Sequence, residues 1–117
     1  MHYSIIIISS NKLTNNFNSN IYHIKEDTFF SNYSIIDNYR INNLRNNSEI
    51  FFDYLIIDSK NFFNKYFKEI SKDDNNLPIT NCYHQTTIDN VFSIGESSSS
   101  SKKIQNQLND IYEFINN

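Results

Sequence analysis

The sequence predicts an α/β fold, a small layered sheet with flanking helices. Residues 3–9 and 49–57 are apolar and strand-like, whereas residues 61–71 and 104–115 carry apolar residues at helical spacing. In chain order the segments read as strand, strand, an uncertain strand or loop, strand, helix, strand, strand and helix. Because strands interleaved with helices build layered α/β structures, we expect residues 1–117 to form one reduced domain.

The first strand is expected at residues 3–9. Its four consecutive isoleucines, Ile5 to Ile8, fit a strand that is buried on both faces, as in a parallel sheet. Residues 20–25 are a short second candidate, and residues 34–36 are a weaker one. The strongest candidate is residues 49–57, in which one acidic residue interrupts an aromatic and aliphatic run.

Two helices and two further strands are expected in the second half. The helix over residues 61–71 rests on Phe62, Phe63, Tyr66, Phe67 and Ile70. The terminal helix rests on the stripe Ile104, Leu108, Ile111 and Ile115. Residues 77–82 and 91–94 are short strand candidates, and residues 42–48 read as a polar connection.

Composition excludes several classes of protein. Thirteen acidic residues outnumber ten basic ones, which argues against a basic nucleic-acid-binding domain. A single Cys cannot staple a secreted scaffold with an internal disulfide. The longest aliphatic run, Ile5 to Ile8, is far too short to cross a membrane, and the His residues show no metal-ligand spacing. We therefore expect a protein of the cytoplasm or an organelle matrix, without nucleic acid, membrane or metal partners.

Residue usage indicates an AT-rich genome, because Asn (21) and Ile (19) abound while Gly occurs once and Ala is absent. Scarcity of Gly shifts backbone positions of positive φ onto Asn. The pairs expected to serve as such turns are Asn15–Asn16, Asn42–Asn43, Asn46–Asn47 and Asn75–Asn76. Asn-rich tracts also fit disorder, but 15% aromatic residues favour a folded domain.

Few residues are candidates for chemistry. Cys82 and His84 would share one face of a strand, so they are either a thiolate–imidazole pair or a pair without chemistry. Asp58 ends a strand, where ligands bind in α/β sheets, but a helix-capping or turn acid is the alternative. The serine run of residues 97–101 is either a flexible linker or a set of donors to an anion.

One segment, Leu77 to Glu96, carries a family resemblance. It reads LPITNCYHQTTIDNVFSIGE and resembles the C-terminal flavin-binding signature of the thioredoxin reductase-like flavoproteins. Thr86-Thr87 matches the Thr-Ser of that signature, Asp89-Asn90 stands where Pro-Gly usually sits, and residues 91–96 match its strand with a Gly-acid end. With the preceding strand and the closing helix, the likeness covers about residues 50–115.

The resemblance implies a reduced dinucleotide-binding, Rossmann-like domain with FAD as cofactor. It assigns close backbone approach to Gly95, a hydrogen bond to the flavin side chain to Glu96, and the start of the phosphate-facing helix to Ser97. Two parts of the family pattern are missing, because Ser9-Ser10-Asn11 replaces the glycine-rich turn and no Cys-x-x-Cys is present. No catalytic residue is therefore assigned.

We thus expect a degenerate flavoprotein domain with residual FAD or NAD(P) binding linked to thiol redox, not catalytic alone. The alternative is a non-enzymatic structural or assembly subunit that joins a partner chain or a second copy, with Phe29-Phe30 and Phe51-Phe52 as contact candidates. A third reading, an active oxidoreductase with NAD(P)H and FAD, conflicts with the missing phosphate loops.

Overall fold

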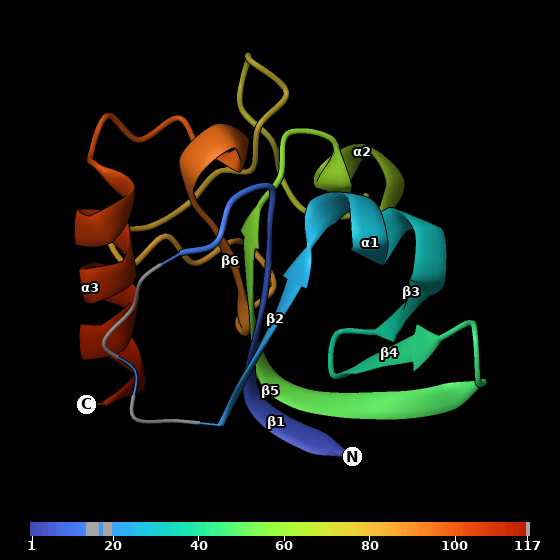
Figure 1. The fold of residues 1–117 in the computed structure, drawn as a ribbon. Coiled ribbons are helices and arrows are strands. Elements are labelled where there is room, and N and C mark those ends of the chain that lie inside the picture. Colours follow the sequence, from blue (N-terminus) through green and yellow to red (C-terminus); the bar gives the residue numbers. More distant parts are fainter. Residues whose placement is uncertain (14–16, 18–19, 117) are drawn as a thin grey trace.

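The computed structural model describes residues 1–13, 17 and 20–116, which fold around one mixed sheet with helices on both faces (Figure 1). This confirms the α/β class. The strands are β1 (His2–Ser9), β2 (Ile21–Lys25), β3 (Tyr33–Asp37), β4 (Arg40–Asn43), β5 (Ser48–Asp58) and β6 (Val91–Ser93). The helices are α1 (Glu26–Asn32), α2 (Phe62–Lys65), the 3-10 turn η1 (Gly95–Ser97) and α3 (Ile104–Ile115).

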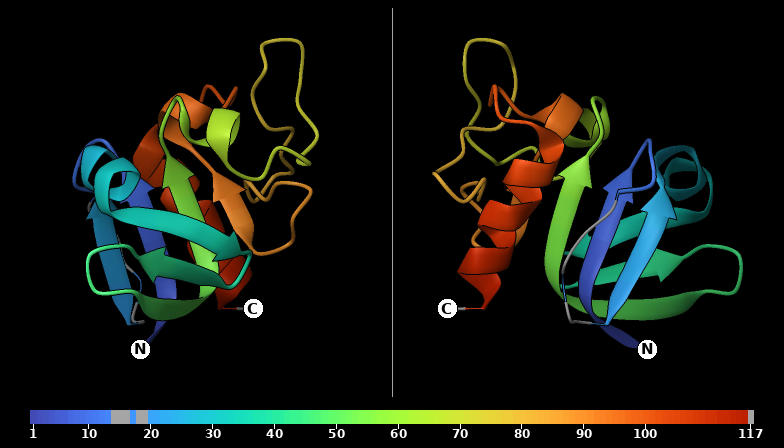
Figure 2. Two further views of the ribbon diagram at one scale, coloured as in Figure 1. Left: turned by 90° about the vertical axis from the view of Figure 1, so that its right-hand side faces the viewer. Right: turned by 60° about the vertical axis from the view of Figure 1, so that its left-hand side comes forward.

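Four of the six strands are parallel. The order β2-β1-β5-β4-β3 places β1 between β2 and β5, and β6 pairs with the end of β5. β3 and β4 are antiparallel and form a meander with the start of β5. The parallel strands therefore end at one side of the sheet, which we call the carboxyl edge. Figure 2 shows the tips of the parallel strands pointing to this edge, where α2 and η1 lie.

The isoleucine run of β1 is buried on both sides, as the sequence predicts. Ile6 and Ile8 belong to one hydrophobic cluster and Ile5 and Ile7 to another, and none is more than 1% exposed. Side chains alternate across a strand, so each pair faces a different layer. Burial of four aliphatic side chains contributes on the order of 6–12 kcal/mol of favourable transfer free energy.

The two layers differ in chemistry. α3 covers one face of the sheet with Leu108 and Ile111 against Phe92 of β6. α1 and α2 cover the other face with a dense aromatic group that includes Phe29 and Phe62. The apolar stripe predicted for the terminal helix is confirmed, with its two central residues fully buried.

The helix predicted over residues 61–71 is wrong beyond Lys65. The chain turns extended at Tyr66, and Phe67 adopts a left-handed φ of +54°. Beyond this point the backbone of Ser71 bonds to the 79–87 segment, and residues 72 and 78 form an isolated bridge. Phe67 and Ile70 still pack in the core. The apolar spacing therefore predicted which side chains are buried, but it did not predict the backbone conformation.

Other local predictions meet mixed outcomes. α1 was not predicted, residues 77–82 form no strand, and the start of the expected 42–48 connection belongs to β4. Asn47 and Asn76 do carry positive φ, at +56° and +63°, which confirms two of the Asn turns. Asn42–Asn43 lies in β4 instead, and the pair at 15–16 lies outside the described residues.

Candidate functional site

The carboxyl edge gathers polar side chains from β1 and β2. Ser9 is fully buried at the end of β1, and its hydroxyl oxygen lies 2.6 Å from Nε2 of His23 on β2. The same hydroxyl donates to the carbonyl oxygen of Asn11. Burial, aided by the charge of Lys12, lowers the pKa of His23. The neutral imidazole is therefore favoured at this position.

The lone glycine lies at the same edge, directly after β6. Gly95 has φ of +56°, and a Cβ at this position would lie 2.6 Å from Cγ of Asp58, the last residue of β5. Oδ1 of Asp58 accepts a hydrogen bond of 2.8 Å from the backbone N–H of Glu96. The absence of a side chain at Gly95 thus leaves room for the carboxylate of Asp58. That carboxylate accepts the hydrogen bond of the Glu96 backbone N–H, which is then not free to bind a ligand.

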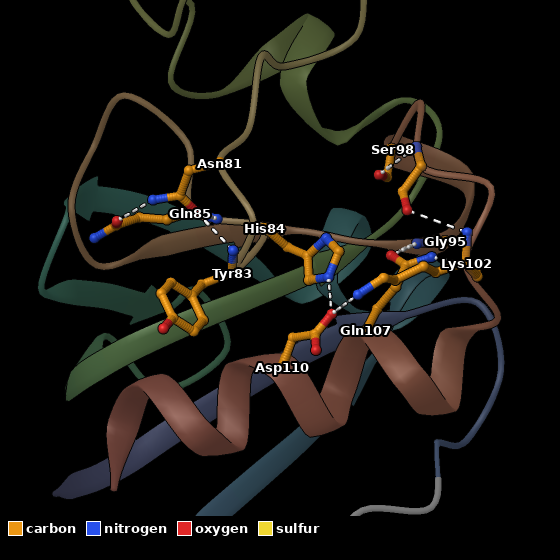
Figure 3. Close-up of polar contacts among 10 residues, drawn as sticks. Asn81, Tyr83, His84, Gln85, Gly95, Ser98, Lys102, Gln107 and Asp110 are labelled. Atoms are coloured by element: carbon orange, nitrogen blue, oxygen red, sulfur yellow. Dashed lines mark hydrogen bonds and ion pairs between the residues drawn. The ribbon is translucent and has the colours of Figure 1, made fainter. Parts of the chain in front are cut away.

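Ser97 and Gln107 complete this corner. The Ser97 hydroxyl lies 2.8 Å from the carbonyl oxygens of both Ile57 and Ile94. Figure 3 shows the neighbouring bond, in which Oε1 of Gln107 accepts the N–H of Gly95. The three residues assigned to FAD by resemblance are therefore brought together and linked to β5 and α3. Their role toward FAD stays a prediction.

A cavity opens beside this corner, where β2 passes into α1. It measures about 450 Å³ and is lined by Glu26, Asp27, Phe30, Asn61 and Lys65. Oε1 of Glu26 accepts a 2.6 Å hydrogen bond from the hydroxyl of Ser59, which follows β5. Sequence reasoning did not select Glu26, although an acid directly after the second strand was a usable signal.

A second polar cluster lies between α3 and the loop before β6 (Figure 3). Asp110 accepts hydrogen bonds at Oδ2 from Nε2 of His84, at 2.9 Å, and from Nζ of Lys102, at 2.8 Å. Burial opposes ionisation of Asp110, but these two bonds outweigh it and lower the pKa of its carboxyl group. Neither Asp110 nor Lys102 was expected from the sequence, because 26 residues separate Asp110 from His84.

The Cys82–His84 pair considered from the sequence is not formed. Cys82 is exposed, whereas His84 is 4% exposed with φ of +65°. Nδ1 of His84 is buried and has no hydrogen-bond partner among the described residues. The two side chains thus occupy different environments, and the thiol is not paired with the imidazole.

Within residues 1–13, 17 and 20–116, no group of three or more His, Cys, Asp or Glu residues is arranged to hold a metal ion. Of the helices in this part of the chain, none has the length and apolar composition needed to cross a bilayer.

Comparison with protein-family models, with curated proteins and with solved structures finds no significant match. These comparisons therefore assign the chain to no family.

Asp58 is expected to make stability depend on pH. Burial, only partly offset by the Glu96 N–H bond, raises the pKa of its carboxyl group. A raised folded-state pKa favours the protonated form on folding, so Asp58 stabilises the fold at low pH and loses this contribution as pH rises through that pKa. Relative to Asp58→Asn, the wild-type protein should therefore gain stability on acidification from about pH 7 to about pH 4.5.

Urea unfolding of both proteins at the two pH values measures this difference. Asp74→Asn is the matched control, since Asp74 is exposed. If the difference in unfolding free energy between the wild type and Asp58→Asn does not change with pH, burial does not raise the pKa of the Asp58 carboxyl group.

Proposed function

We propose that the protein is a degenerate, Rossmann-like flavoprotein domain that retains weak binding of an adenine dinucleotide, FAD or NAD(P), and does not catalyse alone. The observation that carries this proposal is the reversal of strand order at the carboxyl edge. The chain passes from β1 to β2 on one side and later returns to β5 on the other side of β1. In open α/β sheets, ligands bind in the crevice at such a switch point.

The cavity beside Glu26 supports the adenosine half of this proposal. In dinucleotide-binding folds an acidic side chain after the second strand binds the ribose hydroxyls. Glu26 follows β2 directly and lines a cavity of about 450 Å³ with the aromatic ring of Phe30. An unphosphorylated ribose suits a carboxylate better than a 2′-phosphate does, so NAD is favoured over NADP at this cavity.

The region where the diphosphate of a dinucleotide would bind explains why the affinity for FAD or NAD(P) should be low. Ser9 and Ser10 carry side chains where glycines would admit a pyrophosphate, and the N–H of Ser10 already donates to the carbonyl oxygen of Asp58. With few backbone donors left for phosphate, we expect dissociation constants on the order of 1 mM. The single Cys of the chain cannot form a dithiol couple, so any thiol redox role needs a partner.

Titration of the purified protein with NAD, NADP and FAD, followed by ligand-observed NMR, tests the proposal. Glu26→Gln keeps the oxygen that Ser59 bonds but removes the charge, so it should weaken NAD binding roughly tenfold, as expected for one charged hydrogen bond. Glu49→Gln is the control, because Glu49 lies at the opposite end of β5 and pairs with Arg40. Absence of saturable binding, or equal effects of both substitutions, would contradict the proposal.

The assembly-subunit alternative also has one observation in its favour. Four large apolar side chains of the meander, Ile36, Tyr39, Leu44 and Phe51, are 41–54% exposed. Exposed apolar groups mark contact surfaces when they gather on one face. Light scattering after gel filtration measures the mass, and a strict monomer at high concentration would argue against self-assembly.

A further inference from the structure

A cavity separate from the carboxyl edge lies next to Cys82. It measures about 450 Å³ and is bounded by residues 78–82 on one side and by Ser99, Ser100 and Lys102 on the other, with Asp73 and His84 in its wall. We call it the Cys82 cavity. The proposed dinucleotide site uses none of these residues, so the two cavities are independent.

His84, which lines the Cys82 cavity, has one nitrogen without a hydrogen-bond partner in the described part of the chain. Nε2 of His84 faces the carboxylate of Asp110, which only accepts hydrogen bonds when ionised, so Nε2 carries the proton. In the neutral imidazole Nδ1 is then an acceptor, and it is buried without a partner in the described part of the chain. Figure 3 shows this nitrogen turned away from Asp110, between the segment of Asn81 and that of Ser98 and Lys102.

Charge favours a donor as the missing partner. Asp73 and Asp110 contribute two carboxylates near the cavity, whereas Lys102 contributes one ammonium group that is already bonded to Asp110. The hydroxyl of Ser99 and two backbone N–H groups bond to Asp73, and the Ser99 bond is the main cause that lowers the pKa of its carboxyl group. Asp73 therefore stays ionised, and the two carboxylates with the one ammonium group carry a net charge of about −1.

We propose that the Cys82 cavity binds a small primary ammonium compound. Its N–H groups are the donors that the buried Nδ1 of His84 lacks, and its positive charge offsets the surplus carboxylate. An anionic ligand would face that surplus and would leave Nδ1 of His84 without a donor. A buried acceptor left unpaired is unfavourable, so the unpaired nitrogen favours a ligand that donates, and the surplus of carboxylate favours a positively charged one.

The exposed thiol of Cys82 provides a direct assay, because it lines the same cavity. At about pH 8, where imidazoles are neutral, the protein is equilibrated with cystamine, with bis(2-hydroxyethyl) disulfide or with dithiodiglycolate. The Cys82 thiolate attacks one sulfur of the probe, forming a mixed disulfide and releasing the other half as a thiolate, so no further oxidant is needed. Intact mass gives the modified fraction for each probe.

The folded protein should prefer cystamine over the hydroxyethyl probe about tenfold more than the urea-unfolded chain does, as one charged hydrogen bond provides. Dithiodiglycolate should be the poorest probe. The preference must persist at about 0.5 M salt, which screens the general charge of the protein. Equal preferences in the folded and unfolded chain, or a preference for dithiodiglycolate, would overturn the proposal.

Two variants connect the preference to the cavity. Asn tolerates the left-handed backbone of residue 84, and His84→Asn removes the Nδ1 acceptor. The preference for cystamine over the hydroxyethyl probe should therefore fall to that of the unfolded chain, while circular dichroism remains native. Lys102→Gln removes the competing ammonium and should raise this preference. An unchanged preference for cystamine in folded His84→Asn contradicts the proposal. If that variant does not fold, Lys102→Gln decides, because a preference that is unchanged or lowered in this variant also contradicts the proposal.

Discussion

Gly95→Ala is expected to lower the free energy of unfolding by about 3 kcal/mol. A side chain in the left-handed region, at φ of +56°, costs about 1–2 kcal/mol. The added methyl group would also overlap the buried carboxylate of Asp58, and overpacking of this kind costs about 1–3 kcal/mol. Asp58 cannot withdraw freely, because it bonds to the N–H of Glu96.

Urea unfolding separates the two contributions. Asn47→Gly and Asn76→Gly change residues of similar positive φ that lie in exposed turns, and we expect changes below about 1 kcal/mol there. Gly95→Ala combined with Asp58→Ser should recover the steric part and leave the backbone part. A Gly95→Ala protein as stable as the wild type would show that the corner relaxes without cost.

This result bears on how a cofactor site is assigned. A substitution at Gly95 that unfolds the domain would also abolish binding of any ligand, whether or not that ligand touches Gly95. Loss of FAD binding in a Gly95 variant therefore does not assign a flavin contact. Glu26→Gln is the sharper variant, since Glu26 lines an open cavity and its Ser59 bond survives the change.

The parallel part of the sheet was predictable because its signal is local and strong. A run of four isoleucines has no polar side to offer water, so β1 must be covered on both faces, and it is. The terminal helix was predictable for the matching reason. Its apolar stripe is narrow, and its remaining positions are polar.

The 61–71 segment shows where such reasoning fails. The aromatic residues at helical spacing are buried or partly buried, as expected, but the backbone that carries them is not helical beyond Lys65. Hydrogen bonds to residues distant in the sequence hold this backbone instead. The backbone of Ser71 bonds to the Thr87 hydroxyl and to the N–H of Ile79. α1 failed differently, because its sequence EDTFFSN contains no strong apolar period and is helical only in its packed setting.

The candidate site was predictable only in part. The resemblance selected Gly95, Glu96 and Ser97, and the strand end selected Asp58, but nothing in the sequence indicated that Asp58 fills the space beside Gly95. The same limit applies to His84 and Asp110, which meet only because α3 packs over the loop before β6. Contacts across such distances depend on topology, which local patterns do not specify.

The second large effect is expected at Phe29. Its side chain is fully buried, and its ring contacts Tyr33, Phe62 and Tyr66 with centroid separations of 5.6–5.8 Å. Phe29→Ala removes this filling and should lower the free energy of unfolding by about 3–5 kcal/mol. Domains of this size are stable by only about 5–15 kcal/mol, so the variant should be partly unfolded at 37 °C.

Phe51→Ala is the matched control, because Phe51 is 44% exposed on β5. We expect a stability change within about 0.5 kcal/mol there. The pair also tests the assembly alternative, which had named both phenylalanines as contact candidates: buried Phe29 cannot contact a partner, whereas Phe51 can. If Phe51→Ala lowers the solution mass while stability is unchanged, Phe51 belongs to an interface. If it destabilises the monomer as much as Phe29→Ala does, the exposure of Phe51 on β5 is contradicted.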